Sequence, residues 1–197
     1  MAAVKPIVQT GTPGLRAHAR EVPASEIGSP EMKELVATMI ETMRAAPGVG
    51  LAAPQIDVPL RVIVLEERPE FLKNLSEEEV LERGRVAFDT CVFFNPVLTP
   101  IGDQKALFFE GCLSVSGFVG LVERALEVEV SGLDQNGTPQ TWRVQGWPAR
   151  ILQHECDHLD GTLYIDRMKP RSFATTELAQ AHFAGKPVAD ICRLLGI

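Results

Sequence analysis

The sequence contains no apolar run that approaches the roughly 18–20 residues needed to cross a bilayer, which excludes a chain embedded in a membrane. Positive charge is also scarce. The 19 Lys and Arg stand against 26 Asp and Glu, and the resulting net charge of −7 argues against direct nucleic-acid readout. The segment from Met1 to Thr10 has Lys5 as its one charge and no long apolar stretch, so no leader peptide is expected there. These absences favour a bacterial cytoplasmic protein.

Cysteine is sparse as well. The four cysteines, which are widely separated, are Cys91, Cys112, Cys156 and Cys192. Because no leader is expected and the chain is long enough for a hydrophobic core, disulfides are less favoured than buried thiols or a metal ligand. Apolar residues make up 45% and charged residues 23% of the 197 residues, as is typical of folded proteins. We therefore expect a single domain over residues 1–197.

The spacing of apolar residues predicts an α+β fold. Apolar side chains recur at helical spacing from Met32 to Met43, between Pro30 and the helix-ending pair Pro47-Gly48. Strands are predicted over 60–65, 91–98, 105–109 and 126–131, and an Asn-Gly turn at 136–137 predicts an antiparallel hairpin. A further helix is predicted over 148–159. We expect antiparallel sheets packed around this central helix.

Two segments are expected to lie outside the core. Residues 66–90 are acidic, and Ser76 with Glu79 has the spacing of a capping box. We therefore expect a surface excursion that contains a short, solvated helix. Residues 171–197 are expected to form a helical C-terminal tail.

The motif His154-Glu155-Cys156-Asp157-His158, of the HExxH type, lies on the helix predicted over 148–159. Histidines at i and i+4 project from the same face of a helix, so both imidazoles can bind one metal ion. Glu155, next to the first histidine, can reach a metal-bound water without binding the metal itself, which is the position of a general base. The motif therefore predicts a metal-dependent hydrolase.

The third metal ligand is left open by the spacing. Cys156 is a poor candidate because it points to the opposite side of the helix from His154. Glu177 lies at nearly the separation used by one class of zinc endopeptidases, which makes such a peptidase the alternative function. Cys112 lies next to a glycine in a segment that follows a predicted strand. It is modestly favoured over Glu177, as a thiolate ligand.

A second unusual segment is Gly48-Val49-Gly50-Leu51-Ala52-Ala53-Pro54-Gln55. Two glycines separated by one residue allow the backbone to approach another group closely, and Gln55 offers a neutral amide donor. The segment lacks the Lys-Ser/Thr ending of a phosphate-binding loop, so that interpretation fails.

Three segments, taken together and in order, resemble the three motifs of the peptide deformylases. They are Gly48–Gln55, the stretch Glu110-Gly111-Cys112-Leu113-Ser114, and Gln153 to His158. The resemblance covers about Thr10 to Met168. It implies an α+β fold with antiparallel sheets around the ligand-bearing helix, and removal of the formyl group from formylmethionine at the start of nascent polypeptides. It also implies that Cys112, His154 and His158 hold a divalent metal.

The resemblance assigns further roles. Glu155 would carry the proton of the attacking water to the departing nitrogen. The side-chain amide of Gln55 and the backbone N–H of Leu113 would donate to the formyl oxygen, and the backbone of Gly50 would bind the substrate. An apolar pocket for the methionine side chain would be formed by Val49, Phe108, Trp147 and Ile151.

The resemblance also sets expectations for cofactor and partners. Fe²⁺ is the expected working metal, and Zn²⁺, Ni²⁺ or Co²⁺ can occupy the same kind of donor set. The substrate would be nascent chains near the ribosome exit, with the enzyme a monomer or weak dimer. Trp147 resembles the mitochondrial, plant-like branch, which keeps a processed mitochondrial or plastid enzyme open as the alternative compartment. Val119 stands where many relatives carry Arg, so binding of the peptide beyond its first residue is expected to be weaker or differently arranged.

Overall fold

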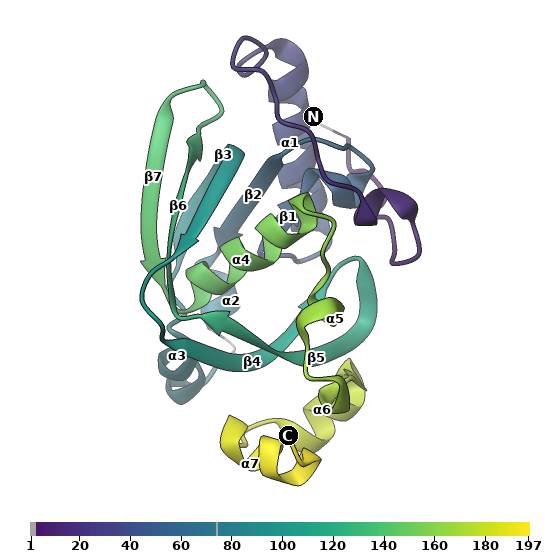
Figure 1. Ribbon diagram of the computed structural model, residues 1–197, viewed down its shortest axis with the longest axis vertical. Coiled ribbons are helices and arrows are strands. Elements are labelled where there is room, and N and C mark those ends of the chain that lie inside the picture. The colour runs from purple at the N-terminus through teal and green to yellow at the C-terminus, as the bar shows by residue number, and fades with distance from the viewer. Residues whose placement is uncertain (1–2, 74) are drawn as a thin grey trace.

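The computed structural model describes residues 3–73 and 75–197, and in these residues two antiparallel sheets enclose one helix, α4 (Trp147–Leu159) (Figure 1). The larger sheet contains, in spatial order, β1 (Gly50–Ala52), β2 (Val62–Glu67), β3 (Phe88–Pro100), β6 (Glu127–Leu133) and β7 (Pro139–Gln145). The smaller sheet contains β4 (Lys105–Cys112), β5 (Val115–Ala125) and β8 (Ala174–Thr175). The predicted α+β class and the antiparallel pairing are confirmed.

The other helices surround this core. They are α1 (Pro30–Ala45), α2 (Pro69–Leu72), α3 (Glu77–Arg83), α5 (Tyr164–Arg167), α6 (Thr176–Phe183) and α7 (Val188–Leu195), with 3-10 turns at η1 (Pro13–Arg16), η2 (Ala53–Ile56) and η3 (Pro170–Ser172). Among the described residues, none of these helices has both the length and the hydropathy that crossing a membrane requires.

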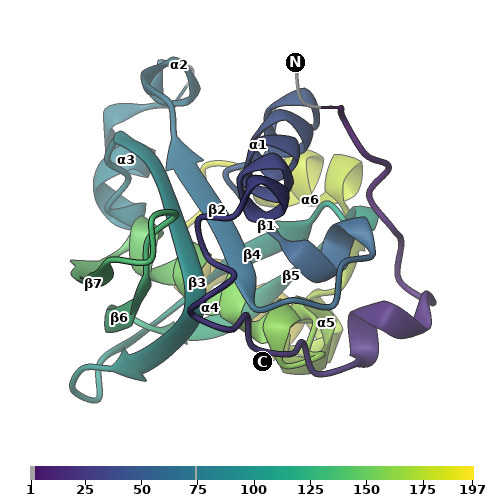
Figure 2. The same ribbon diagram turned by 90° about the horizontal axis from the view of Figure 1, so that it is seen from above.

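Helix α1 forms where the apolar spacing predicts it. Ser29 accepts a hydrogen bond from the backbone N–H of Met32, and Pro30 occupies the first turn, where its missing N–H costs nothing. Its apolar stripe is buried, with Met39 and Met43 fully inaccessible. In Figure 2, α1 lies over β1 and β2, and it buries one face of the larger sheet.

Helix α4 buries the opposite face of the same sheet. Leu152, Cys156 and Leu159 pack in one apolar cluster with Ile63 and Leu65 of β2. Neighbouring β2 residues point the other way, toward α1, so every residue of β2 is buried. The continuous apolar run at 62–65 follows from this placement between two helices. Helix α4 is thereby held rigidly, with its remaining face turned toward β4 and β5.

The excursion expected over 66–90 is shorter than predicted. Glu66 and Glu67 are the last residues of β2, and both carboxylates are buried. The sequence prediction placed them in solvent because it could not see their partners, Arg44 on Glu66 and Arg85 on Glu67. The segment outside the sheet therefore covers 68–87 and contains α2 and α3. The capping box of α3, from Ser76 to Glu79, is present.

The C-terminal tail is helical, apart from its start. Residues Ala174 and Thr175 form β8, which pairs with Val119 and Phe118 of β5. The chain then continues into α6 and α7, which project from one end of the molecule (Figure 1). The tail therefore extends the smaller sheet before it turns helical.

Candidate metal centre

Cys112, His154 and His158 are brought together by the packing of β4 against α4. Their ligand atoms all lie within 4.8 Å of one another, and Cys112 Sγ is 3.3 Å from His158 Nε2. Cys112 sits at the end of β4, where the pairing register with β5 shifts after Gly111. All four cysteines lie within the described residues and are free thiols, in line with the expectation against disulfides.

These three side chains fit a divalent transition metal. One thiolate and two imidazoles are a donor set that suits zinc, iron, cobalt or nickel, and three protein ligands leave a position open for chemistry. The Nδ1 atom of His158 is buried and has no hydrogen-bond partner among the described residues. The Cys112 sulfur and one nitrogen from each imidazole lie close enough together to bind one metal ion.

The pKa values of the two imidazoles are shifted in opposite directions. Burial lowers the pKa of His154, but its hydrogen bonds to Cys112 and Glu110 outweigh burial and raise the pKa well above its ordinary value. Burial, followed by the nearby charge of His154, lowers the pKa of His158 well below its ordinary value. The ring centroids are 5.1 Å apart, so a charge on one ring disfavours a charge on the other.

A buried ion-pair network stands behind His154. Glu110 Oε2 lies 3.0 Å from His154 Nδ1, and the same carboxylate accepts hydrogen bonds from Arg124 (2.9 and 3.0 Å) and Arg150 (2.6 Å). Burial raises the pKa of Glu110, but the hydrogen bonds from His154 and Arg124 outweigh it and hold the pKa far below its usual range. With Nδ1 bound to the carboxylate, Nε2 of His154 is left for a metal.

Arg124 and Arg150 were not singled out by the sequence analysis. The one available signal was the setting of Arg150 in an otherwise apolar part of the predicted helix, whereas Arg124 lies in β5, a strand that was not predicted. Both are about 5% exposed. A charged residue that is almost fully buried requires a partner, but the sequence does not reveal that the partner is Glu110.

Glu155 is buried beside Gly50. Its carboxylate Oε2 has no hydrogen-bond partner within the described part of the chain, and burial raises the pKa of Glu155 to about 7. A Cβ added to Gly50 would lie 2.7 Å from Glu155 Cδ and 2.9 Å from Cγ. The glycine predicted to expose its backbone therefore also provides the space that the Glu155 side chain occupies.

Gln55 is held with its amide group directed at the metal ligands. Its Oε1 accepts a hydrogen bond from the Ala52 N–H (2.9 Å), and its Nε2 donates to Ser114 Oγ (3.2 Å) and to Cys112 Sγ (3.6 Å). The accepting oxygen thus faces η2 and the donating nitrogen faces the thiol. Leu113 follows Cys112 directly, and its carbonyl accepts a hydrogen bond from Gln9 Nε2 at 2.9 Å.

A cavity of about 350 Å³ opens beside the three ligands. Its lining includes most of the residues selected from the sequence: Val49, Gly50, Gln55, Cys112, Leu113, Val119, Trp147, Ile151, His154 and Glu155. Phe108 is not among the lining residues. Its ring contacts the guanidinium groups of Arg83 and Arg150, while its neighbour Phe109 lines the cavity. Adjacent strand residues face opposite ways, so the two rings of β4 have different surroundings.

The alternative ligand Glu177 does not belong to this group of ligands. It is exposed in the first turn of α6, and the metal-ligating group found among the described residues contains Cys112 instead. The sequence separation that suggested Glu177 assumed a following helix that returns to the site. Here, β8 fixes the chain to the edge of β5 immediately before α6 begins.

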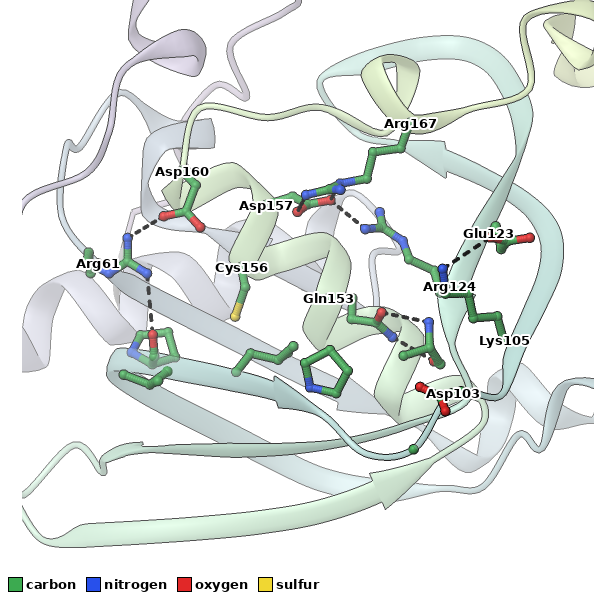
Figure 3. A pocket seen from close by; sticks show the side chains of 16 residues that line it. Arg61, Asp103, Lys105, Glu123, Arg124, Gln153, Cys156, Asp157, Asp160 and Arg167 are labelled. Carbon is green, nitrogen blue, oxygen red and sulfur yellow. Dashed lines mark hydrogen bonds and ion pairs between the residues drawn. The ribbon is translucent and has the colours of Figure 1, made fainter.

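A second cavity, of about 780 Å³, borders other residues of α4 (Figure 3). Gln153, Cys156 and Asp157 line it, and Figure 3 shows Arg124 and Arg167 directed at Asp157. The position of Cys156 agrees with the expectation that it points away from the metal. Burial raises the pKa of the Cys156 thiol to about 12, which makes it an unreactive thiol.

Comparison with known proteins assigns the family. The family model described as polypeptide deformylase matches residues 4–174. The chain belongs to the peptide deformylase family. It is 52% identical over 190 residues to peptide deformylase 1A, chloroplastic/mitochondrial, of Arabidopsis thaliana, covering 96% of this chain and 69% of that protein. It is 40% identical over 167 residues to the mitochondrial peptide deformylase of Homo sapiens, covering 85% and 69%.

Solved peptide deformylases share the fold. The Met-Ala-Ser-bound class I type b enzyme of Acinetobacter baumannii superimposes with a TM-score of 0.76 at 36% identity, covering 85% of this chain and all of that one. The peptide deformylase of Ehrlichia chaffeensis gives a TM-score of 0.72 at 34% identity, covering 85% and 89%. The predicted family, its fold, its hydrolase class and the likeness to the plant and mitochondrial branch are confirmed.

Proposed function

We propose that this chain removes the formyl group from formylmethionine at the N-terminus of nascent polypeptides and releases formate. The observation that carries this proposal is the convergence of one thiol and two imidazoles beside Glu155 and Gln55 in a single cavity. Membership of the peptide deformylase family supports the same activity. Among the described residues, no feature of the site favours the zinc endopeptidase, since Glu177 is exposed on α6 and does not belong to this cluster.

Cys112, His154 and His158 would hold one divalent metal ion, with Fe²⁺ as the working ion and Zn²⁺, Ni²⁺ or Co²⁺ as substitutes. The chemistry that such an ion supplies is Lewis acidity and a lowered pKa for water at its open position. Cys112 and the two histidines are the chain's contribution to binding. Glu110 contributes indirectly, because it fixes the ring of His154 through Nδ1.

Glu155 is the proton carrier in this proposal. It accepts a proton from the attacking water and delivers it to the amide nitrogen that leaves with the peptide. A carboxylate in water would be a weak base at pH 7, whereas burial raises the pKa of Glu155 to about 7, near the pH at which it must both accept and donate.

Gln55 and Leu113 stabilise the formyl oxygen as it becomes negative. Ala52 and Ser114 already orient the Gln55 amide, and the N–H that now reaches Cys112 Sγ at a long 3.6 Å is the one that donates to the formyl oxygen. The backbone N–H of Leu113 is the second donor. Each preorganised donor of this kind typically contributes about 3 kcal/mol to the transition state.

The remaining cavity residues bind the peptide. Val49, Trp147 and Ile151 form the apolar pocket for the methionine side chain, and the backbone of Gly50 binds the substrate main chain. Val119, on the cavity wall, faces the following residues of the peptide with a short apolar side chain. We therefore expect weaker anchoring there than an arginine at this position would give.

Substrate supply and compartment follow from the same proposal. The enzyme meets formylated chains near the ribosome exit, as a monomer or weak dimer. Its similar proteins include both chloroplastic or mitochondrial and bacterial peptide deformylases. A bacterial cytoplasm is our first proposal, and a mitochondrion or plastid is the alternative.

Formate release tests the proposal. The Fe²⁺-loaded protein should release formate from formyl-Met-Ala-Ser and none from acetyl-Met-Ala-Ser. Glu155→Ala should retain the metal and lose several orders of magnitude in turnover, since it removes the proton carrier. A protein that cleaves internal peptide bonds, or that tolerates Glu155→Ala, would contradict the assignment.

A further inference from the structure

Trp147, on the wall of the candidate methionine pocket, is the first residue of α4. The preceding Gly146 adopts a positive φ of 69° and has no side chain that could contact the indole. The polar contacts of the indole come from the end of β2 and from segment 68–87, for which no function was predicted from the sequence.

Two charged groups fix the indole in different directions. Trp147 Nε1 donates a hydrogen bond to Glu67 Oε2 at 2.9 Å, in the plane of the ring. The guanidinium carbon of Arg85 lies 4.5 Å from the ring centroid, which is a cation–π contact with the face of the ring. Arg85 also pairs with the other oxygen of Glu67, Nη2 to Oε1, at 2.5 Å. The three groups form a closed triangle.

The backbone of the segment also packs directly on the start of α4. A Cβ added to Gly84 would lie 3.3 Å from Gly146 Cα, and one added to Gly146 would lie 3.1 Å from Gly84 Cα. The Trp147 N–H points at the Gly84 carbonyl at 3.4 Å. Arg83 extends the contact, with its guanidinium carbon 5.9 Å from the Trp147 ring centroid. Residues 83–85 of this segment are therefore packed against this side of the cavity wall.

Glu67 is the unusual member of this arrangement. It is fully buried at the end of β2, after four apolar residues and Glu66, and a buried carboxylate is costly unless it is paired. Its two oxygens are used for Arg85 and for the indole N–H, respectively. An apolar residue would fill the same space, but it would fix neither the in-plane direction of the indole nor the position of the guanidinium.

We propose that Glu67 and Arg85 are positioning residues that hold the Trp147 indole in the wall of the methionine pocket, and thereby set the selectivity for the side chain of the formylated residue. The inference rests on the proposed function, because it takes Trp147 as part of that pocket. Segment 68–87 is then a support for the substrate pocket that acts through Trp147, without touching the substrate.

Steady-state kinetics with two substrates test this role. Arg85→Met should raise KM for formyl-Met-Ala-Ser about tenfold with little change in kcat, because a loosened pocket wall loses contact with the side chain while the proton carrier is untouched. Discrimination against formyl-Phe-Ala-Ser should fall by about the same factor. Arg85→Lys keeps the charge, so its KM and its discrimination between the two substrates should lie close to those of the parent protein. The control is Arg143→Met, which breaks an exposed ion pair with Glu127 in the β6–β7 hairpin.

Tryptophan fluorescence gives a readout that does not depend on activity. The chain has two tryptophans, so in a Trp142→Phe background Trp147 is the single emitter. Arg85→Met and Glu67→Gln should shift its emission to the red and reduce its response to the product peptide Met-Ala-Ser. Glu67→Gln keeps an acceptor for the indole N–H, so it also serves as the milder variant if Arg85→Met fails to fold.

The outcomes separate the two proposals. If Arg85→Met and Glu67→Gln match Arg143→Met in KM, in substrate ratio and in Trp147 emission, the positioning role is wrong. If the parent protein releases no formate, the proposed function is wrong, and the emission measurements still decide whether Glu67 and Arg85 orient the indole.

Discussion

Replacing Gly50 with alanine should disable the proton carrier while leaving the metal in place. The added Cβ would stand 2.7 Å from Glu155 Cδ and closer still to Glu155 Oε1, and ordinary contact begins near 3.4 Å, so the carboxylate must move by about 1 Å. Glu155 is 4% exposed and lines the cavity, so this shift would take the carboxylate away from the position in which it carries the proton. A misplacement of about 1 Å in a catalytic group costs roughly 100-fold, equivalent to about 2.7 kcal/mol of barrier.

The assay is formate release with the metal content measured on the same sample. For Gly50→Ala we expect kcat to fall about 100-fold while one metal per chain is retained, because Cys112 and both histidines are untouched. The control is Gly14→Ala, whose Cβ approaches the Asp57 carboxylate at 3.2 Å, outside the cavity. An unchanged kcat with only a higher KM would refute the displacement of Glu155 and leave Gly50 with a role in substrate binding alone.

Two further predictions concern buried carboxylates. Glu110→Gln should weaken metal binding by about 10–100-fold, measured by competition with a chelator, because an amide no longer balances the charges of Arg124 and Arg150 or fixes His154 as strongly; unchanged affinity would argue against that role. The hydrogen bond from Arg44 is the main cause that holds the pKa of Glu66 below its ordinary value of 4.5. The ionised Glu66 side chain therefore stabilises the fold fully above pH 4.5, and this stabilisation is lost as the pH falls through the pKa of the folded state. The melting temperature of Glu66→Gln should therefore lie below that of the parent at pH 7 and approach it at pH 3, and a constant difference would contradict the linkage.

Local sequence patterns predicted the parts of the fold that depend on local physics. The apolar spacing of α1 and the i, i+4 histidines of α4 are set by helical geometry within a few residues. Strand β5 was missed because Gly117 and Gly120 interrupt the alternation, although it pairs along nearly all of β4. What makes it a strand is a long-range partner, and such a partner leaves little local trace.

The metal site shows the same contrast between features set by neighbouring residues and features set by long-range packing. Spacing identified His154 and His158 as a pair, but it could not decide between Cys112 and Glu177, because that choice depends on how β4 packs on α4. The setting of Cys112 favoured the thiol only modestly, and the family resemblance then pointed to it. The acids at the end of β2 were misread for a related reason, since an Asp- or Glu-rich stretch is usually solvated and nothing nearby reveals that Arg85 lies opposite Glu67.

The buried ion-pair network behind His154 explains how a metal site can lie in the interior of the protein. Glu110 and Asp157 are balanced by Arg124 and Arg150, so the buried group is close to neutral. Arg124 can bridge the two acids because its guanidinium presents donors in a fixed fork, with Nε and Nη2 on Glu110 and Nη1 on Asp157. A lysine has one ammonium group and could not span both carboxylates in this geometry. The orientation of the His154 ring is therefore set by the protein, independently of the metal that binds to it.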